Sequence, residues 1–307
     1  MLAQLLRFPD ERRALEDGEW VYERKLDGLR CLATRNGPEV QLWSRNRLSF
    51  TARFPRIVDA IAGLPVDEVT LDGEVVAFDE QGRTSFALLQ QSGRQAPPVF
   101  VVFDVLQLLG TDTRDLPLAE RSTLVDRILE AAPSTPGRPL SGVERLTGDP
   151  ATLLENACSQ GWEGLVAKRP ASTYRPGRST DWRKLKCSAS QELVVGGWTD
   201  PTGSRSAFGA LLVGYYDDGR LVFAGKVGTG FTEAELRRLH AMLLERAIPA
   251  CPFDGPVRMK GAHWVRPELV AAVSFTEWTR DGKLRHPRYE GLRTDKPAAE
   301  VRREVPG

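Results

Sequence analysis

The sequence predicts an α+β protein in two parts. The first part has mainly antiparallel strands with flanking helices, because strand and helix patterns follow one another and Asn36-Gly37 is a hairpin signal between two strands. After residues 187–190, short strands punctuated by glycine take over with a single helix among them, which is the pattern of a small closed β-barrel. We therefore expect a first domain at 1–188 and a second at 189–307.

Composition and charge describe a globular chain. Of its 307 residues, 41% are hydrophobic and 27% are charged, and the net charge is +1, so a nucleic-acid partner would need local basic patches. No stretch reaches the apolar length of a bilayer span, and residues 1–20 contain no hydrophobic signal core. We expect a cytoplasmic protein with no membrane partner.

The cysteines are scattered along the chain with no CxxC pair, which argues against a zinc site and against a disulfide framework. We expect small buried side chains in a reducing cytosol. The positions concerned are Cys31, Cys158, Cys187 and Cys251.

The elements of the first part can be placed by hydrophobic periodicity, after a lead-in at 1–19 with little periodicity. Strands are expected at 20–35, 40–43, 69–78, 99–109, 163–168 and 181–186. Helices are expected at 54–61, 86–91, 118–131 and 151–160. In the second part, strands are expected at 193–198, 210–216, 221–227 and within 265–278, with a helix at 232–246 that begins with a capping box.

An apolar run at 20–22 leads into the charged stretch that contains Lys25, and the turn signal Asp27-Gly28 follows. This combination would expose the amine of Lys25 at the edge of a sheet. A solvated surface lysine is one interpretation, and a nucleophilic lysine is the other. The amine attacks only when neutral, so it needs desolvation or neighbouring cations to lower its pKa. We expect Arg30 to supply such a cation.

Other charged residues occupy strands. Glu74 lies inside an apolar strand. Either it is on the solvent-facing side of an edge strand, or it is buried, and then it must face a polar cleft, bind a cation or be paired. A basic segment at 168–186 is interleaved with aromatic and turn residues. Within it, Lys184 and Lys186 would point to the same face of a strand, and phosphate is the obvious anion to lie between them.

Together these residues suggest phosphoryl or nucleotidyl transfer, which needs cations around phosphates, acids to hold Mg²⁺ and a stacking surface for a base. No Walker A sequence and no GxGxxG is present. The candidates are Lys25, the glutamates Glu74 and Glu163, the aromatic Phe103, and the bases Arg45, Lys168, Lys184 and Lys186.

The order and spacing of these motifs resemble the covalent nucleotidyltransferases, specifically the ATP-dependent DNA ligases. The matching stretches are 25–30, 44–46, 71–76, 100–106, 163–168 and 182–186. In the second half, 223–230, 274–279 and 291–296 resemble the ligase module of bacterial ligase D, an end-joining enzyme. The resemblance implies a nucleotidyltransferase (adenylation) domain followed by an OB-fold domain. The polymerase and phosphoesterase modules usual in ligase D have no room, so we expect a stand-alone enzyme of this branch or a domain of a longer chain.

The resemblance also implies residue roles. Lys25 would attack the α-phosphate of ATP to leave a lysyl-AMP, with Asp27 as a metal or catalytic helper. AMP would then pass to a 5′-phosphate in DNA, and the 3′-hydroxyl would displace it to seal the break. The nucleotide and phosphate contacts would come from Glu23, Arg30, Arg45, Glu74, Phe103, Lys168, Lys184, Lys186, Arg293, Asp295 and Lys296. The Mg²⁺ or Mn²⁺ ligands would be Glu74 and Glu163.

The resemblance implies nicked or broken duplex DNA as the substrate, in double-strand break repair, and a Ku-type end-binding protein as a candidate partner. It also implies a monomer that is associated with the bacterial nucleoid. Two alternatives stay open. An RNA ligase or RNA-capping guanylyltransferase shares the lysine chemistry, and a non-catalytic DNA-end binder would bind DNA in a salt-sensitive way without using ATP. The preferred kind of break, a 3′ ribonucleotide preference and the choice between Mg²⁺ and Mn²⁺ are also open.

Overall fold

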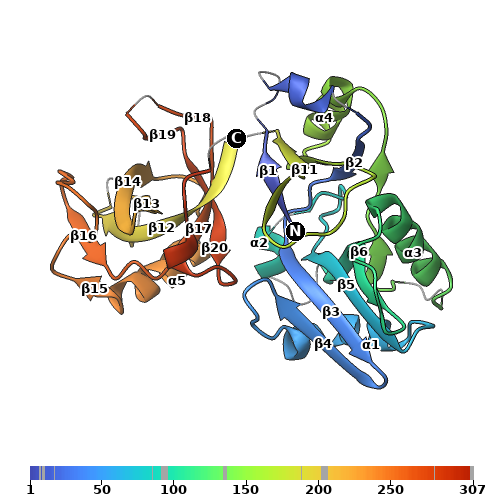
Figure 1. Cartoon of the computed structure of the whole chain (residues 1–307). Helices are drawn as coiled ribbons and strands as arrows, with labels where there is room; N and C mark the ends of the chain where they lie inside the picture. The colour runs from blue at the N-terminus through green and yellow to red at the C-terminus, as the bar shows by residue number, and fades with distance from the viewer. Residues whose placement is uncertain are drawn as a thin grey trace. The chain divides into compact units, whose positions relative to one another are not determined.

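The computed structural model describes residues 1–6, 8, 11–16, 18–84, 86–90, 96–133, 137–187, 189–201, 207–279 and 281–304. The chain divides into two compact units, Met1–Cys187 (unit 1) and Ser188–Val305 (unit 2; Figure 1). The division expected from the sequence, between residues 188 and 189, lies one residue away from this boundary.

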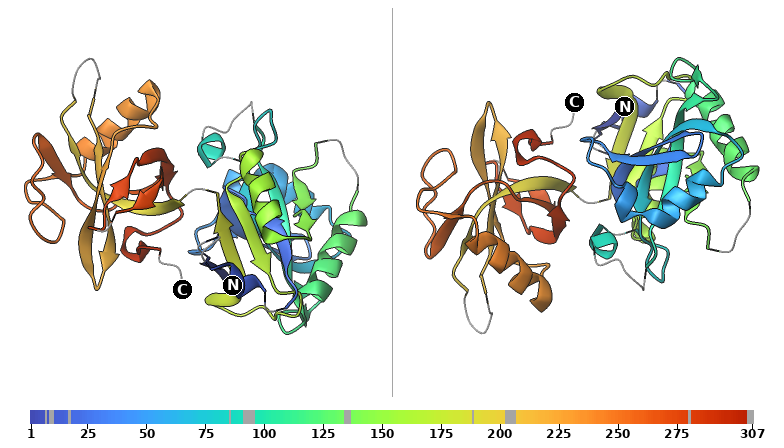
Figure 2. Two further views of the ribbon diagram at one scale, coloured as in Figure 1. Left: turned by 90° about the horizontal axis from the view of Figure 1, so that it is seen from above. Right: turned by 90° about the horizontal axis from the view of Figure 1, so that it is seen from below.

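Unit 1 contains two sheets with helices against them (Figures 1 and 2). Sheet 1 has the strand order β1-β11-β10-β2-β9, and sheet 2 has the order β4-β3-β5-β6-β7 with β8 paired to β6. The strands of sheet 1 are β1 (Leu2–Leu5), β2 (Val21–Arg24), β9 (Arg145–Leu146), β10 (Gly164–Lys168) and β11 (Arg178–Lys186). Those of sheet 2 are β3 (Leu29–Asn36), β4 (Glu39–Ser44), β5 (Glu68–Val76), β6 (Val99–Leu108), β7 (Thr111–Asp112) and β8 (Leu140–Gly142).

Helices cover one face of each sheet. They are α1 (Pro55–Ala62), α2 (Phe86–Gln90), α3 (Leu118–Glu130) and α4 (Pro150–Ser159), with short 3₁₀ turns at Arg12–Leu15 and Thr51–Arg53. Apolar residues of sheet 2, such as Leu71 and Phe100, pack with Ile57 of α1 and Val125 of α3. Figures 1 and 2 show α3 at the periphery of unit 1 in each view.

Sheet 1 has a separate apolar core against α4. It is formed by Tyr22, Leu165, Ala167 and Leu185 of the sheet with Leu154 and Ala157 of the helix. The opposite face of each sheet carries the charged and aromatic residues described below. The alternation of side chains along a strand therefore separates the packing residues of unit 1 from the residues of the candidate site.

One sequence expectation for the start of the chain is wrong. The expected strand at 20–35 is two strands, because β2 belongs to sheet 1 and β3 to sheet 2. The crossing between the sheets needs Gly28, where a Cβ atom would lie 2.3 Å from the carbonyl oxygen of Val75. The lead-in, where the sequence shows little periodicity, contains β1, which pairs in parallel with β11. Four residues are too few to show an alternating pattern.

Unit 2 is an antiparallel sheet with one flank covered by α5 (Glu233–Leu244). The strands of its main sheet are β12 (Ala189–Thr199), β13 (Leu211–Asp217), β14 (Arg220–Val227), β15 (Ala247–Ile248), β16 (Ala262–Val265), β17 (Val270–Phe275) and β20 (Arg288–Arg293). A hairpin of β18 (Glu277–Trp278) and β19 (Leu284–Arg285) stands beside it, and a 3₁₀ turn lies at Ala298–Glu300. The predicted cap of α5 is confirmed, since the Thr232 hydroxyl accepts the backbone N–H of Glu235 at 3.2 Å.

The long strand β12 organises unit 2. Its first half pairs with β17 and its second half with β13 and β16, and β17 pairs in turn with β20. Strands wrapped in this way enclose one apolar core with α5, which includes Leu193, Leu212, Val273, Leu239 and Leu243. This is the arrangement that the glycine-punctuated second part of the sequence predicts.

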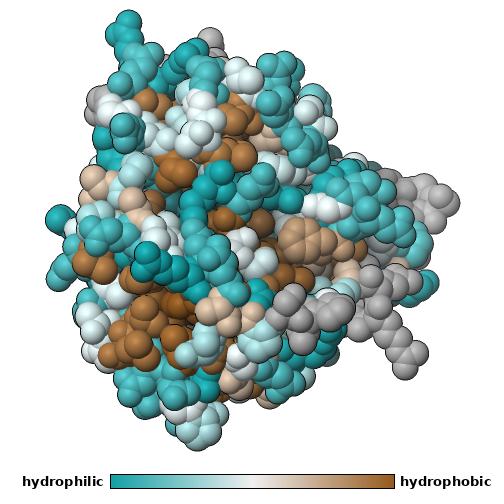
Figure 3. Space-filling view, turned by 90° about the vertical axis from the view of Figure 1, so that its right-hand side faces the viewer, coloured by the Kyte–Doolittle hydropathy of each residue, from teal (hydrophilic) through white to brown (hydrophobic). Residues whose placement is uncertain are grey.

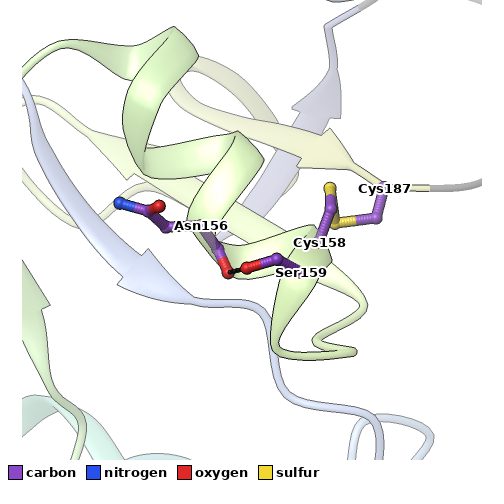
Figure 4. The surroundings of a disulfide bond; sticks show 4 residues. All are labelled: Asn156, Cys158, Ser159 and Cys187. Atoms are coloured by element: carbon purple, nitrogen blue, oxygen red, sulfur yellow. Dashed lines mark hydrogen bonds between the residues drawn. A yellow bond between two sulfur atoms is a disulfide. The ribbon is translucent and has the colours of Figure 1, made fainter.

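The expectation for the cysteines is wrong at three positions. Cys158, which is exposed, and Cys187 form a disulfide, and Cys251 is an exposed thiol (Figure 4). The bonded pair is 29 residues apart in sequence, so spacing gave no signal. It forms because α4 packs on β10, and the β10–β11 hairpin returns the chain to the end of that helix.

Within the described residues, no helix is both long and apolar enough to cross a membrane. Figure 3 shows one face of the molecule, on which hydrophobic side chains form patches between hydrophilic ones.

Candidate active site

Strand register brings the charged residues of sheet 1 together. Val166 of β10 lies between Glu23 of β2 and Lys184 of β11, and Lys168 lies opposite Trp182. Residues opposite each other in antiparallel strands point to the same face, as do alternate residues of one strand. The face turned away from α4 therefore carries Glu23, Lys168, Trp182, Lys184 and Lys186.

Lys25 stands at the exit of β2 beside the start of β10. Its backbone N–H donates to the carbonyl of Gly164 at 2.9 Å, and its Nζ donates to Oε2 of Glu163 at 2.6 Å. The two side chains are only 20% and 21% exposed. The close approach depends on Gly164, whose φ is +148° and where a Cβ atom would lie 1.9 Å from the carbonyl oxygen of Leu185.

The charges around Lys25 differ from the sequence expectation. Burial lowers the pKa of the amine, but Glu163, and then Asp27 and Glu74, outweigh it and raise this pKa above its ordinary value. The expectation that Arg30 lowers the pKa of Lys25 is therefore wrong. Glu163, 2.6 Å from the amine, therefore stabilises the charged ammonium form of Lys25.

Arg30 is occupied by a buried carboxylate. Its Nε and Nη2 donate to the two oxygens of Asp72 at 3.0 and 2.6 Å, and the hydroxyl of Tyr174 donates to Oδ2 of Asp72 at 2.8 Å. The guanidinium also lies 5.5 Å from the ring centroid of Phe103. Burial comes first among the influences on Arg30 and lowers its pKa, but Asp72 overcomes this and raises the pKa above the usual range.

Sequence reasoning missed Asp72 and Tyr174. Asp72 precedes Glu74 by two residues in β5, so both lie on the same face, and this spacing could have revealed the second acid. Glu74 is half-buried, and its charge raises the pKa values of both Lys25 and Arg30. Nothing in the sequence around Tyr174 shows that it reaches β5, because 102 residues separate it from Asp72.

The inner faces of the two sheets meet at Phe103. This ring contacts Trp182 edge-on with centroids 6.1 Å apart, and Lys168 Nζ lies 4.5 Å from the Phe103 centroid and 4.0 Å from the Trp182 ring. Lys168 also forms a buried ion pair with Oε2 of Glu23 at 2.5 Å. Burial raises the pKa of Glu23, and the charge of Lys168 opposes this shift.

Three buried polar atoms at this junction lack a hydrogen-bond partner among the described residues: Oε1 of Glu23, the indole N–H of Trp182 and Nζ of Lys168. Lys168 Nζ is compensated by its ion pair with Glu23, so the other two atoms are the ones without a polar contact in the described part of the chain. Buried polar atoms are nearly always paired in folded proteins, so an unpaired acceptor and an unpaired donor beside an aromatic ring are candidate contacts for a ligand. A nucleotide base offers the matching donors, acceptors and stacking surface.

Asp27 has a structural role that its motif did not predict. Its carboxylate accepts the backbone N–H of Phe86 at 3.0 Å, and its own N–H donates to the hydroxyl of Thr84 at 3.1 Å. These bonds join the turn after Lys25 to the start of α2. The carboxylate still lies close enough to Lys25 to raise the pKa of its amine.

The acids suit a divalent cation shared with a substrate. Among the described residues, no cluster of three or more His, Cys, Asp or Glu side chains is arranged as a metal site. Mg²⁺ is commonly held by one or two carboxylates together with substrate phosphates and waters. Glu163 accepts a hydrogen bond from Lys25, and both Glu163 and Glu74 raise the pKa of its amine. Two such carboxylates near the lysine fit that mode of binding.

The remaining predicted residues lie elsewhere. Arg45 is exposed in the turn that follows β4. Arg293, Asp295 and Lys296 belong to unit 2, where Arg293 pairs with Asp295 at 2.9 Å and Lys296 pairs with Glu192 at 3.0 Å.

Comparison with known proteins agrees with the two units. Residues 1–186 match the ATP dependent DNA ligase domain, and residues 204–296 match the ATP dependent DNA ligase C terminal region. The expected nucleotidyltransferase fold followed by an OB-fold domain is thereby confirmed.

Individual proteins show the same relationship. The chain is 42% identical over 298 residues to the multifunctional non-homologous end joining protein LigD of Pseudomonas aeruginosa, covering 94% of this chain and 35% of that protein. It is 38% identical over 308 residues to the multifunctional non-homologous end joining DNA repair protein LigD of Mycobacterium tuberculosis, covering 99% of this chain and 40% of that one. The chain thus spans less than half the length of these relatives.

A solved structure completes the comparison. A mycobacterial DNA ligase D complexed with ATP and MES is 37% identical, with a TM-score of 0.68 over 93% of this chain and 92% of that one. The matches to family and structure, and the lysine–carboxylate geometry of unit 1, lead to one conclusion: the chain belongs to the ATP-dependent DNA ligases.

Proposed function

We propose that this chain seals 5′-phosphate/3′-hydroxyl breaks in duplex DNA through a lysyl-AMP intermediate on Lys25, in double-strand break repair by end joining. The observation that carries the proposal is the position of Lys25. Its Nζ lies 2.6 Å from Oε2 of Glu163. The same unit contains buried polar atoms near Phe103 that lack a hydrogen-bond partner among the described residues, including Oε1 of Glu23 and the indole N–H of Trp182. The family match and the end-joining names of the relatives support this assignment.

In the first step, neutral Lys25 Nζ attacks the α-phosphorus of ATP. A phosphorus–nitrogen bond forms, the bond from the α-phosphorus to the bridging oxygen breaks, and pyrophosphate leaves with that electron pair. Because the ammonium is paired with Glu163, it must first pass a proton to that carboxylate or to water, and this contact must loosen before the amine attacks. Mg²⁺ or Mn²⁺ held by Glu163 and Glu74 would supply positive charge that neutralises the phosphates and competes for these carboxylates.

The base is recognised at the junction of the two sheets. Phe103 stacks on adenine, and Oε1 of Glu23 accepts a hydrogen bond from the exocyclic amino group. Guanine has a carbonyl oxygen at that position, which would face a carboxylate oxygen without a proton between them. ATP is therefore favoured over GTP, which separates this function from RNA capping.

Phosphate contacts come from residues with different positions in the chain. Lys168, Lys184 and Lys186 lie on the same face of sheet 1, and in this proposal they hold the phosphates. Lys168 must exchange its ion pair with Glu23 for phosphate in order to do so. Arg45, on its exposed turn, contacts the 5′-phosphate at the break. Arg30 lines the nucleotide site next to Phe103.

Unit 2 assists the first step through Arg293, Asp295 and Lys296. Two of these residues are cations in ion pairs, with Asp295 and with Glu192. Cations of this kind can exchange a carboxylate for the pyrophosphate that leaves. In the later steps, AMP passes to the 5′-phosphate and the 3′-hydroxyl displaces it.

The test separates the steps. Lys25→Ala should abolish sealing that begins from ATP, yet leave measurable sealing of a nick that already carries AMP. Lys260→Ala, at an exposed lysine of unit 2, is the matched control and should seal both substrates. Sealing with ATP by Lys25→Ala would show that the nucleophile is elsewhere.

End joining makes a further demand on partners. A Ku-type end-binding protein should raise the rate of joining two duplex ends more than the rate of sealing a nick, since only the former must bring two molecules together. The expected setting is the cytoplasm, at the nucleoid, with the protein acting as a monomer. Equal effects of the partner on both substrates would argue for a nick-sealing enzyme instead.

A further inference from the structure

The Cys158–Cys187 disulfide lies where unit 1 ends. Cys158 belongs to the last turn of α4, and Cys187 follows the last residue of β11 and is the last residue of unit 1 (Figure 4). Their Cα atoms are 5.3 Å apart. Cys158 is exposed and Cys187 is half-buried, so small thiols and disulfides can reach the bond.

The disulfide closes a small ring that contains Glu163. The chain runs from Cys158 through the end of α4 to Glu163, whose carbonyl accepts the backbone N–H of Cys187 at 3.0 Å. The backbone N–H of Trp162 donates back to Ala157 at 2.9 Å within the same turn. The disulfide and the Cys187 hydrogen bond therefore hold the backbone of Glu163 from both sides.

This ring touches the candidate active site directly. Oε2 of Glu163 is 2.6 Å from Lys25 Nζ, and Gly164, the next residue, accepts the backbone N–H of Lys25. The segment between the two cysteines also contains β10 and β11, with Lys168, Trp182 and Lys184. A covalent bond at the two ends of this segment restrains the part of unit 1 that carries most of its sheet 1 site residues.

We propose that Cys158 and Cys187 form a thiol–disulfide modification site that switches the ring around Glu163 between a closed and an open form. The oxidant is a small disulfide of the glutathione class. One cysteine thiolate attacks it to give a mixed disulfide and one glutathione thiolate. The second cysteine thiolate then attacks the cysteine sulfur of the mixed disulfide, which forms the Cys158–Cys187 bond and releases the second glutathione thiolate. Two cysteine thiols are oxidised to one disulfide, and one glutathione disulfide is reduced to two glutathione thiols.

The two forms differ in how firmly Glu163 is held. In the closed form, the disulfide keeps Cys187 beside Glu163 and preserves the hydrogen bond between them. In the open form, only that hydrogen bond and the strand pairing remain. In reducing compartments, disulfides are typically transient or redox-sensing. A pair with one exposed and one half-buried cysteine, next to site residues, fits such a role better than a purely structural role.

The experiment uses the full chain carrying Cys251→Ser, which removes an exposed thiol that could form mixed disulfides of its own. The protein is equilibrated with glutathione disulfide or with dithiothreitol, and free thiols are counted by mass after alkylation. Backbone hydrogen exchange is then measured for peptides covering 158–165 and 182–187. Strand β13 of unit 2 serves as the internal reference.

The closed form should show the mass of an internal disulfide and slower exchange at both peptides, by roughly tenfold relative to the open form, with β13 unchanged. Adding Cys158→Ser should give the open-form exchange under both conditions. Exchange that is identical in the two redox states, or two glutathione adducts in place of the internal bond, would overturn the proposal.

The meaning for catalysis rests on the proposed function of Glu163. If Glu163 holds the metal, Cys158→Ser should need about threefold or more Mg²⁺ for half-maximal labelling by ATP than the parent in its disulfide form. Cys251→Ser alone, also in its disulfide form, should not differ from the parent. An unchanged Mg²⁺ requirement would contradict the link to Glu163. Absence of labelling in every variant would contradict the proposed function, while the exchange measurement would still decide on the disulfide.

Discussion

Replacing Arg121 by methionine is predicted to destabilise unit 1 by about 3–5 kcal/mol, because it breaks an ion pair that is entirely removed from water. Arg121, in α3, donates Nε and Nη2 to the two oxygens of Asp104 at 2.7 and 3.0 Å, and both side chains are 0% exposed. Its Nη1 also donates to the carbonyl of Ser172 at 3.1 Å. Methionine fills most of the space of the stem, so the expected loss comes from an unpaired buried carboxylate rather than from a cavity.

The assay is urea unfolding, monitored by a signal that reports on unit 1, and it gives the free energy of unfolding of that unit. Arg127→Met is the matched control, since it makes the same change at an exposed arginine of the same helix and should alter stability by less than about 0.5 kcal/mol. The double variant Arg121→Met/Asp104→Leu should recover most of the loss, because no charge is then left buried. A loss for Arg121→Met no larger than that of the control would refute the reasoning.

Further outcomes follow from other contacts. Gly164→Ala should destabilise the β10–β11 hairpin by about 2–4 kcal/mol and abolish labelling by ATP, since its Cβ would meet Leu185; normal stability by urea unfolding would contradict this. Burial favours the protonated form of Glu235, but hydrogen bonds from Arg238 and Tyr289 overcome it and lower its pKa below the ordinary value. This carboxylate therefore stabilises unit 2 above its unfolded pKa, and the contribution is lost as pH falls through the lower folded value. Tyr289→Phe should move that loss to higher pH in acid unfolding curves, and curves that superimpose would argue against it.

Elements with their own local pattern could be predicted from the sequence. Helix α3, the long apolar strand β6 and the cap of α5 need only periodicity or a capping residue, and each is present. Two residues of the candidate site could be predicted in the same way. Glu74 and Phe103 lie on strands whose patterns show them as an acid in an apolar strand and an aromatic in a buried one.

Features that depend on partners distant in sequence could not be predicted. The disulfide of Cys158 and Cys187 follows from the packing of α4 on β10, which no local pattern reports. The pKa of Lys25 depends on Glu163, which is 138 residues away in the sequence. The expectation from nearby residues, that Arg30 sets this pKa, is therefore wrong. The parallel pairing of β1 likewise needs β11, at the opposite end of unit 1 in sequence.

The measurement that tests the central claim most directly is a labelling experiment. The protein is incubated with α-labelled ATP and Mg²⁺, denatured, and examined for label that stays on the polypeptide, with GTP and Lys25→Ala run in parallel. Our account predicts label from ATP, little from GTP, and none in the variant. No label on protein that is also shown by mass to carry no AMP would contradict covalent catalysis at Lys25 and favour a DNA-end binder with a ligase fold.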